Sequence, residues 1–437
     1  MHMDIPSVYR YHERYGKTFE ISPLVAQPAF ATIDPVNIKA ITTGKEWGVQ
    51  VFRLAGMEYF CGRGFLTTDG DIWQPSRKLL KPTFAKNNLQ DLSYLSQQVD
   101  DMFGQLLEDG TTVDLQPLFY TMFLNTSIKF LLGVDPTKSL KDAPHTSEEF
   151  IHSFHDALSL TMFRLLLGRL WSLLPQKRYF RVCKTAHDYL DYSIDQALSA
   201  SAEMQPKSYR EGPPSLLTGL STQTDDRLFI RSQILQGMMA SQETTSALLG
   251  NSCFLLSRHP KYWEQIRIAL KSYEVSDFSF DVLLNLTVVQ NILMESLRLY
   301  PVFPIMGRSA TQDTRLPVGG GPNQDEPIFI PKGTVANMSW YALHRDPVVY
   351  GKDVETFRPE RWETIQPTHW EFMGFGGGNR ECLGKQKVLV EAAYVLVRLA
   401  KKFEVLESRD KEDWVGEMKL TCKSKNGCKV ALYGNSI

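Results

Sequence analysis

The stretch "FGGGNRECLGKQ", Phe375–Gln386, decides the fold, because it sets one cysteine among glycines and charged residues near the C-terminus. Most free cysteines are buried small hydrophobic residues. Cys382, however, is separated by two residues from "KQKVLVEAAYVLVRLAKKF", which follows Gly384 and has the pattern of an amphipathic helix. A helix N-terminus favours the thiolate, and a thiolate is a metal ligand. The glycines before it remove side chains where a flat ligand needs close backbone approach.

Composition narrows the class of protein. The chain has 437 residues, of which 43% are apolar and 22% charged, and its formal net charge is -1. It therefore lacks the basic field of nucleic-acid-binding proteins, and DNA or RNA is not an expected partner. The six cysteines form no CxxC pair and no cluster with zinc spacing. Cys422 and Cys428 flank "KSKNG", whose Asn-Gly is typical of a hairpin turn. A C-terminal hairpin is expected, with a disulfide across it as a minor alternative to free thiols.

Hydropathy gives no membrane span. No run approaches the ~18 apolar residues that a spanning helix needs, and the N-terminus lacks the apolar core of a signal peptide. As given, the chain is expected to be soluble or at most peripheral. The opening "MHM" is consistent with the scar of a removed segment.

Helical periodicity dominates from about Asn87 to Leu299. The longest pattern begins after Asp225 and Asp226 and ends at His259-Pro260; it is apolar nearly all round, which predicts a central buried helix. Short strands are expected at "KTFEIS", "FATID", "PIFIP", "TVANMSW" and "KVALYG". Pro206–Ser215 is the best loop candidate. The prediction is a mainly α protein forming one integrated unit.

Five residues around the cysteine carry a family resemblance. Phe375, Gly378, Arg380, Cys382 and Gly384 match FxxGxRxCxG, and the stretch resembles the haem-binding loop of the cytochrome P-450 superfamily of haem-thiolate monooxygenases. The resemblance implies haem b (iron protoporphyrin IX) with Cys382 as axial ligand. It also implies the cytochrome P-450 fold, with a large helical lobe, a smaller β-rich lobe, and haem between the long central helix and the cysteine loop.

The same resemblance predicts one domain over 1–437. Its β-rich part would come from about 17–42 and 303–365 plus the C-terminal hairpin, and its helical part from about 70–300 and 384–402. The N-terminal membrane anchor of fungal relatives is absent from the chain as given, by deletion or an incomplete gene model.

A charged cluster supports the resemblance. Glu295 and Arg298 fit the ExxR helix of the family, although Glu264/Arg267 and Glu355/Arg358 have the same spacing. The order along the chain favours the first pair, because "FRPERW" follows it and Arg361 can complete a Glu-Arg-Arg cluster. A third charge from a distant loop would lock the helix to the haem loop. The alternative is a surface ion pair of little energetic value.

Other residues are carried over as contacts to haem. Trp73 and Arg77, four apart on an expected helix, offer an indole N–H and a guanidinium to a propionate. Arg380 and Arg308 would supply further positive charge, since buried carboxylates need partners. For Arg308 a surface position is the alternative.

The chemistry would lie on the long helix. "ASQETT", Ala240–Thr245, resembles the acid-threonine motif of the family, with Glu243 and Thr244 relaying protons to iron-bound oxygen. Ser241 stands where the family usually has glycine. Slower oxygen activation and an extra hydroxyl in the relay are both open.

An apolar pocket is implied, and with it a lipophilic substrate. By resemblance it is lined by the loop before Trp73, the long helix and "VFPIM": Phe52, Leu54, Met57, Phe60, Leu235, Met238, Met239, Val302, Phe303, Ile305 and Met306. The chain is most similar to fungal alkane and fatty-acid hydroxylases through its GGGP loop and "YALHRDPVVYGKD". Departures at Ser241, Asn379 and Glu381 favour a specialised terpenoid, polyketide or alkaloid substrate. Glu381 either faces solvent or lowers the potential of the iron.

Electrons must come from outside, because no flavin or dinucleotide motif is present. NADPH-cytochrome P-450 reductase is the expected partner, and the endoplasmic reticulum membrane, on its cytosolic face, the expected native location. The expected basic docking patch, with ordinary surface lysines as the alternative, is Lys78, Lys81, Lys86, Lys385 and Lys387. Leu160–Pro175 either contacts a membrane surface or forms a core helix pair. The rival functions are a haem-thiolate isomerase or dehydratase without external electrons, and a non-catalytic haem or lipid carrier.

Overall fold

The computed structural model describes residues 5–22, 28–138, 140–203 and 215–434. The loop expected at Pro206–Ser215 lies outside the described residues except for Ser215. The chain divides into two compact units. The first comprises Met1–Gly48, Val99–Tyr120 and Thr244–Ile437, and the second Val49–Gln98 and Thr121–Glu243. The helices α6 (Ser93–Phe103), α7 (Leu115–Leu132) and α11 (Arg227–Leu256) have residues in both.

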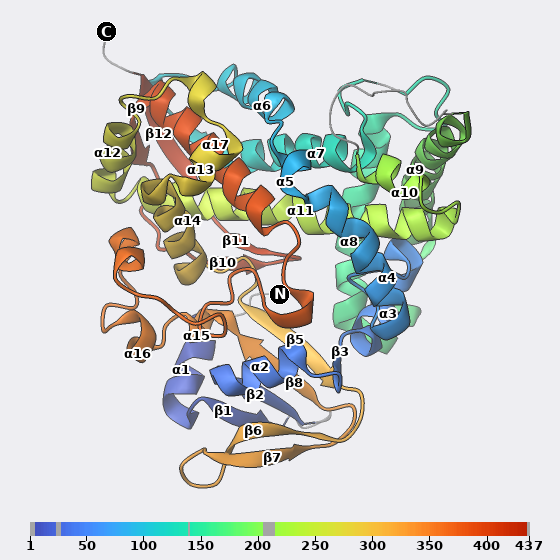
Figure 1. Ribbon diagram of the computed structural model, residues 1–437, viewed down its shortest axis with the longest axis vertical. Coiled ribbons are helices and arrows are strands. Elements are labelled where there is room, and N and C mark those ends of the chain that lie inside the picture. Colours follow the sequence, from blue (N-terminus) through green and yellow to red (C-terminus); the bar gives the residue numbers. More distant parts are fainter. Residues whose placement is uncertain (1–4, 23–27, 139, 204–214, 435–437) are drawn as a thin grey trace. The chain divides into compact units, whose positions relative to one another are not determined.

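A five-stranded sheet with the order β1-β2-β8-β5-β3 organises one end of the first unit (Figure 1). Only β2 and β8 pair in parallel, with Phe30 opposite Ala336. The strands are β1 (Thr18–Ile21), β2 (Ala29–Thr32), β3 (Trp47–Gly48), β5 (Ile305–Ala310) and β8 (Val335–Ser339); β6 (Thr314–Gly320) and β7 (Glu326–Ile330) form a separate hairpin. The expected strands at "KTFEIS", "FATID", "PIFIP" and "TVANMSW" are therefore confirmed.

Helices accompany the strands of this sheet along the chain. Asp34 caps α2 (Pro35–Thr43) by accepting a hydrogen bond from the Val36 N–H, and Pro35 suits the first turn because it needs no such partner. Ile38 and Ile41 of α2 are buried in one apolar core with Phe30, Leu316 and Met338. The preceding helix is α1 (Ile5–Tyr15), and the short α15 (Trp340–Leu343) and α16 (Pro347–Tyr350) follow β8.

Helix α17 (Lys385–Lys402) confirms the helix expected after the cysteine. It packs beside α12 (Pro260–Ala269), α13 (Phe280–Asn285) and α14 (Thr287–Leu299), as Figure 1 shows. Its middle is buried nearly all round, from Leu389 to Ala400, because several helices cover it. The 3-10 turns of this unit are η3 (Val275–Asp277), η4 (Pro359–Glu363) and η5 (Gly378–Arg380).

The C-terminal hairpin expected across "KSKNG" is wrong. β11 (Cys422–Ser424) pairs with β10 (Gly416–Met418), whereas β12 (Lys429–Gly434) pairs with β4 (Asp109–Asp114) and β9 (Phe403–Ser408). The Asn-Gly turn thus joins two different sheets, although the strand at "KVALYG" is confirmed. Cys422 and Cys428 are buried free thiols, so the disulfide alternative is also wrong.

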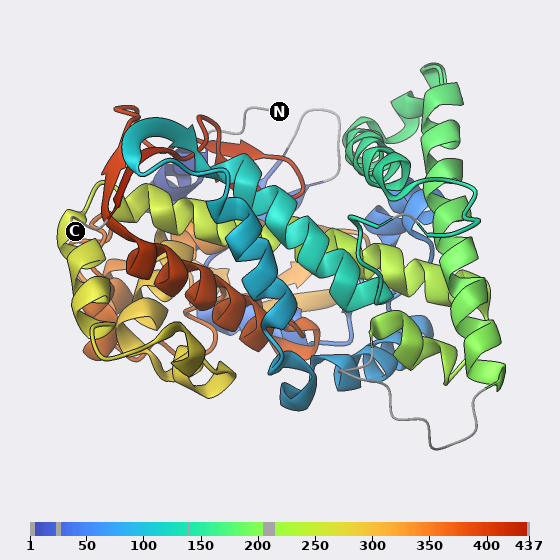
Figure 2. The same ribbon diagram turned by 90° about the horizontal axis from the view of Figure 1, so that it is seen from above.

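Helices make up the second unit. α8 (Ser147–Leu167) and α9 (Lys177–Glu203) lie side by side (Figure 2). A capping box starts α8, because Thr146 and Glu149 satisfy each other's backbone N–H groups. The remaining elements are α3 (Gln50–Cys61), α4 (Gly70–Leu80), η1 (Lys81–Phe84), α5 (Lys86–Leu89), η2 (Gly168–Leu173) and α10 (Leu216–Ser221).

Helix α11 confirms the expected long central helix and is buried along most of its length. Within the second unit, two buried glutamines of α11 bond the end of α3, the chain that follows it, and α4. Gln236 accepts from the Leu66 N–H at 2.7 Å and donates to the Cys61 carbonyl at 3.0 Å. Gln233 donates to the Ser76 hydroxyl at 3.0 Å.

Candidate active site

The cysteine loop ends at the N-terminus of α17. Gly384 is its N-cap residue, and the Val388 N–H bonds the Gly384 carbonyl at 2.9 Å. The Cys382 N–H donates to the Phe375 carbonyl at 2.9 Å, which closes the loop on itself, and the Cys382 side chain is exposed. Lys385 lies with its Nζ 5.7 Å from the centre of the Phe375 ring. The backbone thus presents the thiol at the positive end of a helix dipole.

The three glycines of the loop have different reasons to be glycine. A Cβ on Gly378, whose φ is +67°, would lie 2.5 Å from the Thr42 carbonyl oxygen of α2. One on Gly377 would lie within about 3 Å of His369, Met373 and Trp370. Gly376 has a φ of +68°, and its Cβ would meet only the Arg380 carbonyl at 4.0 Å. Gly377 and Gly378 therefore let the loop pack on the protein, whereas the space beside Gly376 is open.

Glu295, Arg298 and Arg361 come together and are fully buried. Arg298 donates to Glu295 at 2.9 Å and 2.8 Å, and Arg361 Nε lies 3.3 Å from Glu295 Oε1. Further bonds run to neighbouring segments rather than to the cysteine loop. Arg298 reaches the His344 and Val354 carbonyls, and Arg361 reaches Asp353. Arg361 is expected from the sequence to lock α14 to the haem loop. These hydrogen bonds instead join α14 to the segments around His344 and Val354, and Arg361 to Asp353.

The cluster depresses one carboxyl pKa. Hydrogen bonding and charge attraction from Arg361 hold the pKa of Asp353 below its ordinary value. Arg361 stays protonated, because Asp353 and Glu295 raise the pKa of its guanidinium despite burial. The Asp353–Arg361 pair therefore favours the charged form of both partners.

The four proposed propionate contacts lie in different environments. In the first unit, Arg308 is buried on β5 and donates to the Gly307 carbonyl at 2.8 Å, so its surface alternative is wrong. Arg380, in η5, is half-buried. In the second unit, Trp73 and Arg77 share one face of α4, as expected, with the guanidinium 6.0 Å from the centre of the indole ring. All four side chains interact with other groups of the protein.

The segment around the acid-threonine pair interrupts the burial of α11. Ala240, Ser241, Glu243 and Thr244 are half-buried, between fully buried turns on both sides. The Ser241 hydroxyl lies 3.5 Å from the Met238 carbonyl of its own helix. The helix thus offers small and polar side chains over one short accessible stretch.

Gln242 was missed by the sequence reasoning. It is buried in the second unit, and its Nε2 lies 2.6 Å from His155 Nε2 of α8. Burial lowers the pKa of His155. A polar residue on a buried helix face was the available signal.

The predicted pocket residues are apolar and mostly packed. Phe52, Leu54, Met57 and Phe60 lie on the helix α3, so their expected placement in a loop is wrong; Met57 and Phe60 are buried and the other two half-buried. Leu235, Met238 and Met239 are buried on α11. In the first unit Val302 is buried, and Phe303, Ile305 and Met306 are half-buried at the start of β5.

The turn between β10 and β11 was also missed. The Cys422 N–H donates to the Val302 carbonyl at 2.8 Å, which brings Lys419–Thr421 next to the predicted pocket segment. Trp414 stacks on Tyr300 with ring centres 4.1 Å apart, which holds the chain before β10 against the chain just before Val302. Only a contact between distant stretches reveals this, so no local pattern signalled it.

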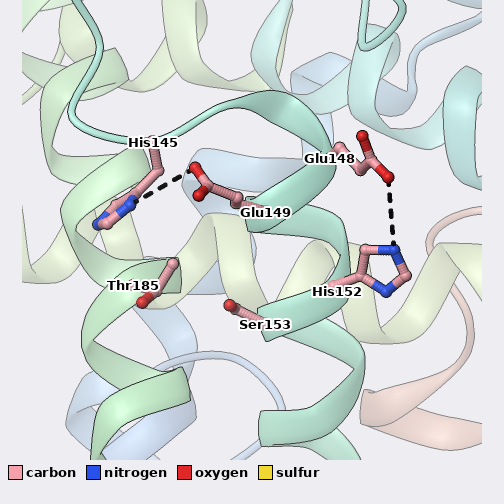
Figure 3. Close-up of a pocket in the computed structure, with 6 residues that line it drawn as sticks. All are labelled: His145, Glu148, Glu149, His152, Ser153 and Thr185. Carbon is pink, nitrogen blue, oxygen red and sulfur yellow. Dashed lines mark ion pairs between the residues drawn. The ribbon is translucent and has the colours of Figure 1, made fainter.

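A surface cavity of the second unit lies away from these residues. It has a volume of about 370 Å³ and is lined by residues of α8, of α9 and of the segment before α8: His145, Glu148, Glu149, His152, Ser153 and Thr185 (Figure 3). In Figure 3 the imidazoles face carboxylates, with His145 Nδ1 3.8 Å from Glu149 and His152 Nε2 3.9 Å from Glu148. None of the predicted site residues lines it. Its shape and polarity do not match a pocket for a lipophile.

The five lysines of the expected docking patch are not equivalent. In the second unit, Lys78, Lys81 and Lys86 are exposed. In the first, Lys385 is half-exposed and lies 3.7 Å from Glu381, but Lys387 is buried and lies 2.6 Å from Glu391. Lys387 therefore drops out of the patch. Glu381 is half-exposed, on the same turn as Lys385.

The residues fit a haem. The donor set includes one exposed sulfur at a helix N-terminus, with no side chain at Gly376 and open space beside it. Arg308 and Arg380 supply cations in the same unit. Thiolate, cations and a side-chain-free backbone are the chemistry that a haem iron and its propionates require.

Comparison with known proteins agrees with this geometry. Residues 2–428 match the sequence family described as cytochrome P-450. Cytochrome P-450 monooxygenase FPY7 of Fusarium mangiferae is 35% identical over 97% of this chain and 82% of its own length. Cytochrome P-450 monooxygenase fsdH of Fusarium heterosporum is 36% identical over 96% and 76%, and cytochrome P-450 52E2 of Candida apicola 32% identical over 90% and 79%.

No helix among residues 5–434, outside the gaps given above, is both long and apolar enough to cross a membrane. The family match over nearly the whole chain, the helix-dominated fold and the exposed cysteine at the start of α17 agree with one another. The protein belongs to the cytochrome P-450 family and is a haem-thiolate monooxygenase, an oxidoreductase that incorporates oxygen from O2 into a lipophilic substrate with electrons from a redox partner.

Proposed function

We propose that the protein hydroxylates a lipophilic fungal metabolite, with Cys382 as the axial ligand of haem iron and electrons from NADPH-cytochrome P-450 reductase. The observation that carries the proposal is the exposed Cys382 side chain at the N-terminus of α17. Haem with a thiolate ligand supplies the oxidation chemistry, because sulfur electron density favours O–O cleavage. The residues of the chain hold the haem, orient the substrate and supply the proton.

Arg308 and Arg380 of the first unit hold the propionates, and Trp73 and Arg77, on one face of α4 in the second unit, are separate candidates for the same role. Guanidinium groups suit this role because they stay charged and bind carboxylates through two N–H groups. The partners that Arg308 already has within the sheet fix its side chain, so little conformational entropy is lost when a carboxylate binds.

Glu243 and Thr244 hold and move a proton at the Thr244 hydroxyl. Their half-buried position within a buried helix supports this role, since a proton relay needs some access to water. Ser241 adds a second hydroxyl on the same short stretch. Its hydroxyl donates to the Met238 carbonyl at 3.5 Å, and both effects left open for it stay open.

The substrate is a specialised terpenoid, polyketide or alkaloid, or a fatty acid or alkane. Support comes from the apolar character of the predicted pocket residues and from fungal relatives called monooxygenases. A screen of these classes for a low-spin to high-spin shift in the haem spectrum would identify it. Turnover with reductase and NADPH is the expected result; turnover with a hydroperoxide alone would favour an isomerase instead.

The reductase docks on lysine side chains that reach the solvent. Lys78, Lys81 and Lys86 on one unit, and Lys385 on the other, remain candidates for an acidic partner. Charge reversal at Lys385 should weaken reductase binding in a salt-dependent way, whereas unchanged affinity in the quadruple Glu variant would remove this assignment.

The native protein lies on the cytosolic face of the endoplasmic reticulum membrane. Exposed apolar side chains on α8, η2 and the residue after it support a surface contact with lipid: Phe163, Leu166, Leu170, Leu173 and Leu174. Lys177 and Arg178 follow directly and are exposed, which suits anionic lipid headgroups. The core-helix-pair alternative does not account for this exposure.

A further inference from the structure

His344 is a buried histidine that none of the roles above uses. It follows α15, has no exposed surface, and lies between the Glu295 cluster and the start of the cysteine loop. Its carbonyl accepts a hydrogen bond from Arg298 Nη1 at 3.1 Å. Its ring accepts one at Nε2 from the Met373 N–H, at 2.9 Å. One residue thus bonds both the ionic cluster and the loop.

The bond to Met373 fixes the protonation state of the ring. An imidazole nitrogen that accepts an N–H bond carries no proton, so the proton of His344 lies on Nδ1. Burial and the nearby charges of Arg298 and Arg345 lower the pKa of His344 to about 3. The ring is therefore neutral and held in one tautomer at any pH at which the protein works.

The acceptor continues into the loop through backbone bonds. The Met373 carbonyl accepts from the Gly376 N–H at 2.9 Å, and the Phe375 carbonyl accepts from the Cys382 N–H at 2.9 Å. Since Gly376 and Phe375 are adjacent, the path from His344 to Cys382 consists of three hydrogen bonds and short covalent segments.

The face of the ring adds a second contact. His344 stacks on Phe372 with ring centres 4.8 Å apart and planes 19° from parallel. Trp362 packs its ring against Phe372 at 4.9 Å and donates from Nε1 to Glu295 at 3.0 Å. Phe372 thus lies between two residues that each bond the ionic cluster.

We propose that His344 is a positioning residue, whose unprotonated Nε2 fixes the start of the cysteine loop and thereby the orientation in which Cys382 presents its sulfur. The direct link expected from Arg361 is instead made through this neutral ring. The proposal rests on the haem-thiolate assignment for its consequence, but the hydrogen bond itself belongs to the protein alone.

The test replaces the acceptor and then restores it. His344→Leu removes Nε2 but keeps an apolar side chain, whereas His344→Gln can place its Oε1 near the position of Nε2. His12→Leu is the matched control: it also removes a buried histidine, which packs on Phe19 at 4.9 Å and lies 3.2 Å from the Gly16 carbonyl near the N-terminus. Phe372→Leu tests the stacking contact while leaving the acceptor in place.

Two measurements on each variant distinguish the outcomes. Hydrogen exchange at the Met373 amide reports the bond, and the carbon monoxide spectrum of the reduced protein reports the fraction with thiolate ligation. In His344→Leu we expect exchange at Met373 to rise on the order of tenfold relative to global unfolding, together with a smaller thiolate-ligated fraction. His344→Gln restores both, and His12→Leu changes neither.

Equal behaviour of His344→Leu and His12→Leu at equal thermal stability would overturn the proposal. So would a folded His344→Gln that exchanges at Met373 as fast as the leucine variant. If His344→Leu does not fold, His344→Gln decides alone, since protection at Met373 supports the bond and its loss rejects it. A wild-type protein with a protected Met373 amide but no thiolate signal would instead reject the haem-thiolate role of Cys382.

Discussion

Glu295 accepts two hydrogen bonds from Arg298, at 2.9 Å from Nε to Oε2 and 2.8 Å from Nη2 to Oε1, and neither side chain is exposed. Glu295 also accepts from the Arg358 N–H and from Trp362. Glu295 and Arg298 have thus been removed from water, whereas Arg358 and Trp362 are half-buried. A buried ion pair of this kind is costly to break on one side, because the remaining charge has no compensation.

Glu295→Gln should therefore lower the free energy of unfolding by about 3–5 kcal/mol and reduce haem content. Glu264→Gln is a control with the same sequence spacing, because Glu264 is 59% exposed and lies 3.8 Å from Arg267. Its effect should stay below about 1 kcal/mol. Chemical denaturation of both variants measures the difference, and equal losses would contradict the assignment of the first pair as the structural one.

Cys382→Ser should abolish the red-shifted Soret band of the reduced carbon monoxide complex, because a serine oxygen does not replace thiolate as a donor. Cys422→Ser is the control, since this cysteine is buried on β11 and burial raises the pKa of its thiol to about 12. The control should keep the band at the same wavelength and intensity. A band that survives in Cys382→Ser would refute the ligand assignment.

Thr244→Ala should separate oxygen consumption from product formation. Without the hydroxyl, the proton relay loses its last group, and the rate of product formation should fall on the order of a hundredfold. Substrate binding should be unchanged by the spin-shift assay. Thr245→Val, at a buried neighbour on another face of α11, should leave the ratio of product to oxygen intact. A normal ratio in Thr244→Ala would remove the relay role.

Stability should fall with acid below neutral pH. Burial lowers the pKa of His12 to about 4 and that of His344 to about 3, against an ordinary value near 6.5. Each ring takes up its proton only on unfolding, so the contribution is complete above pH ~6.5 and is lost as pH falls towards the lowered pKa. The slope is about 1.4 kcal/mol per pH unit for each proton.

Denaturation curves between pH 6.5 and 4 would measure that slope, each pH limit being set by the ordinary and lowered pKa values. His12→Gln should reduce that slope by the contribution of one proton, about 1.4 kcal/mol per pH unit. His152→Gln, at a largely exposed site, is the control and should leave it unchanged. A slope that His12→Gln does not alter would show that the ring is not held neutral.

The apolar surface on α8 and η2 should bind lipid. Leu166→Ser and Leu173→Ser should each weaken binding to anionic vesicles by about 1.5–3 kcal/mol, the value of burying one leucine. Val348→Ser is the control, because Val348 is an exposed apolar residue on α16, in the other unit. Sedimentation with vesicles gives the affinities, and equal affinities for all three variants would argue against this surface as the contact.

Local patterns predicted the elements well. The helix after Cys382 and the strands at "KTFEIS" and "TVANMSW" have clear periodicity and clear ends, which is why their positions were correct. The C-terminal hairpin failed for the opposite reason. An Asn-Gly turn reports a local reversal of the chain, but which strand pairs with β12 is decided by contacts with β4 and β9 far away in sequence.

The site shows the same division. The motif around Cys382 and the residues of the Glu295 cluster could be predicted from the sequence, whereas the burial of Lys387 and the link through His344 could not. Lys387 has the sequence context of a surface lysine, and only the packing of α17 reveals that Glu391 holds it inside. A neutral acceptor such as His344 Nε2 leaves no pattern in sequence, because its partner is a backbone N–H.

The packing of Gly378 against Thr42 has a practical consequence for protein engineering. Position 378 admits no side chain of any size unless α2 moves away, because the obstacle is a backbone carbonyl and not a rotatable group. Gly376, two residues away, is restricted by its backbone conformation alone, so asparagine, which tolerates a positive φ, is the substitution to try there. Variant libraries of the cysteine loop should keep glycine at position 378 and vary position 376.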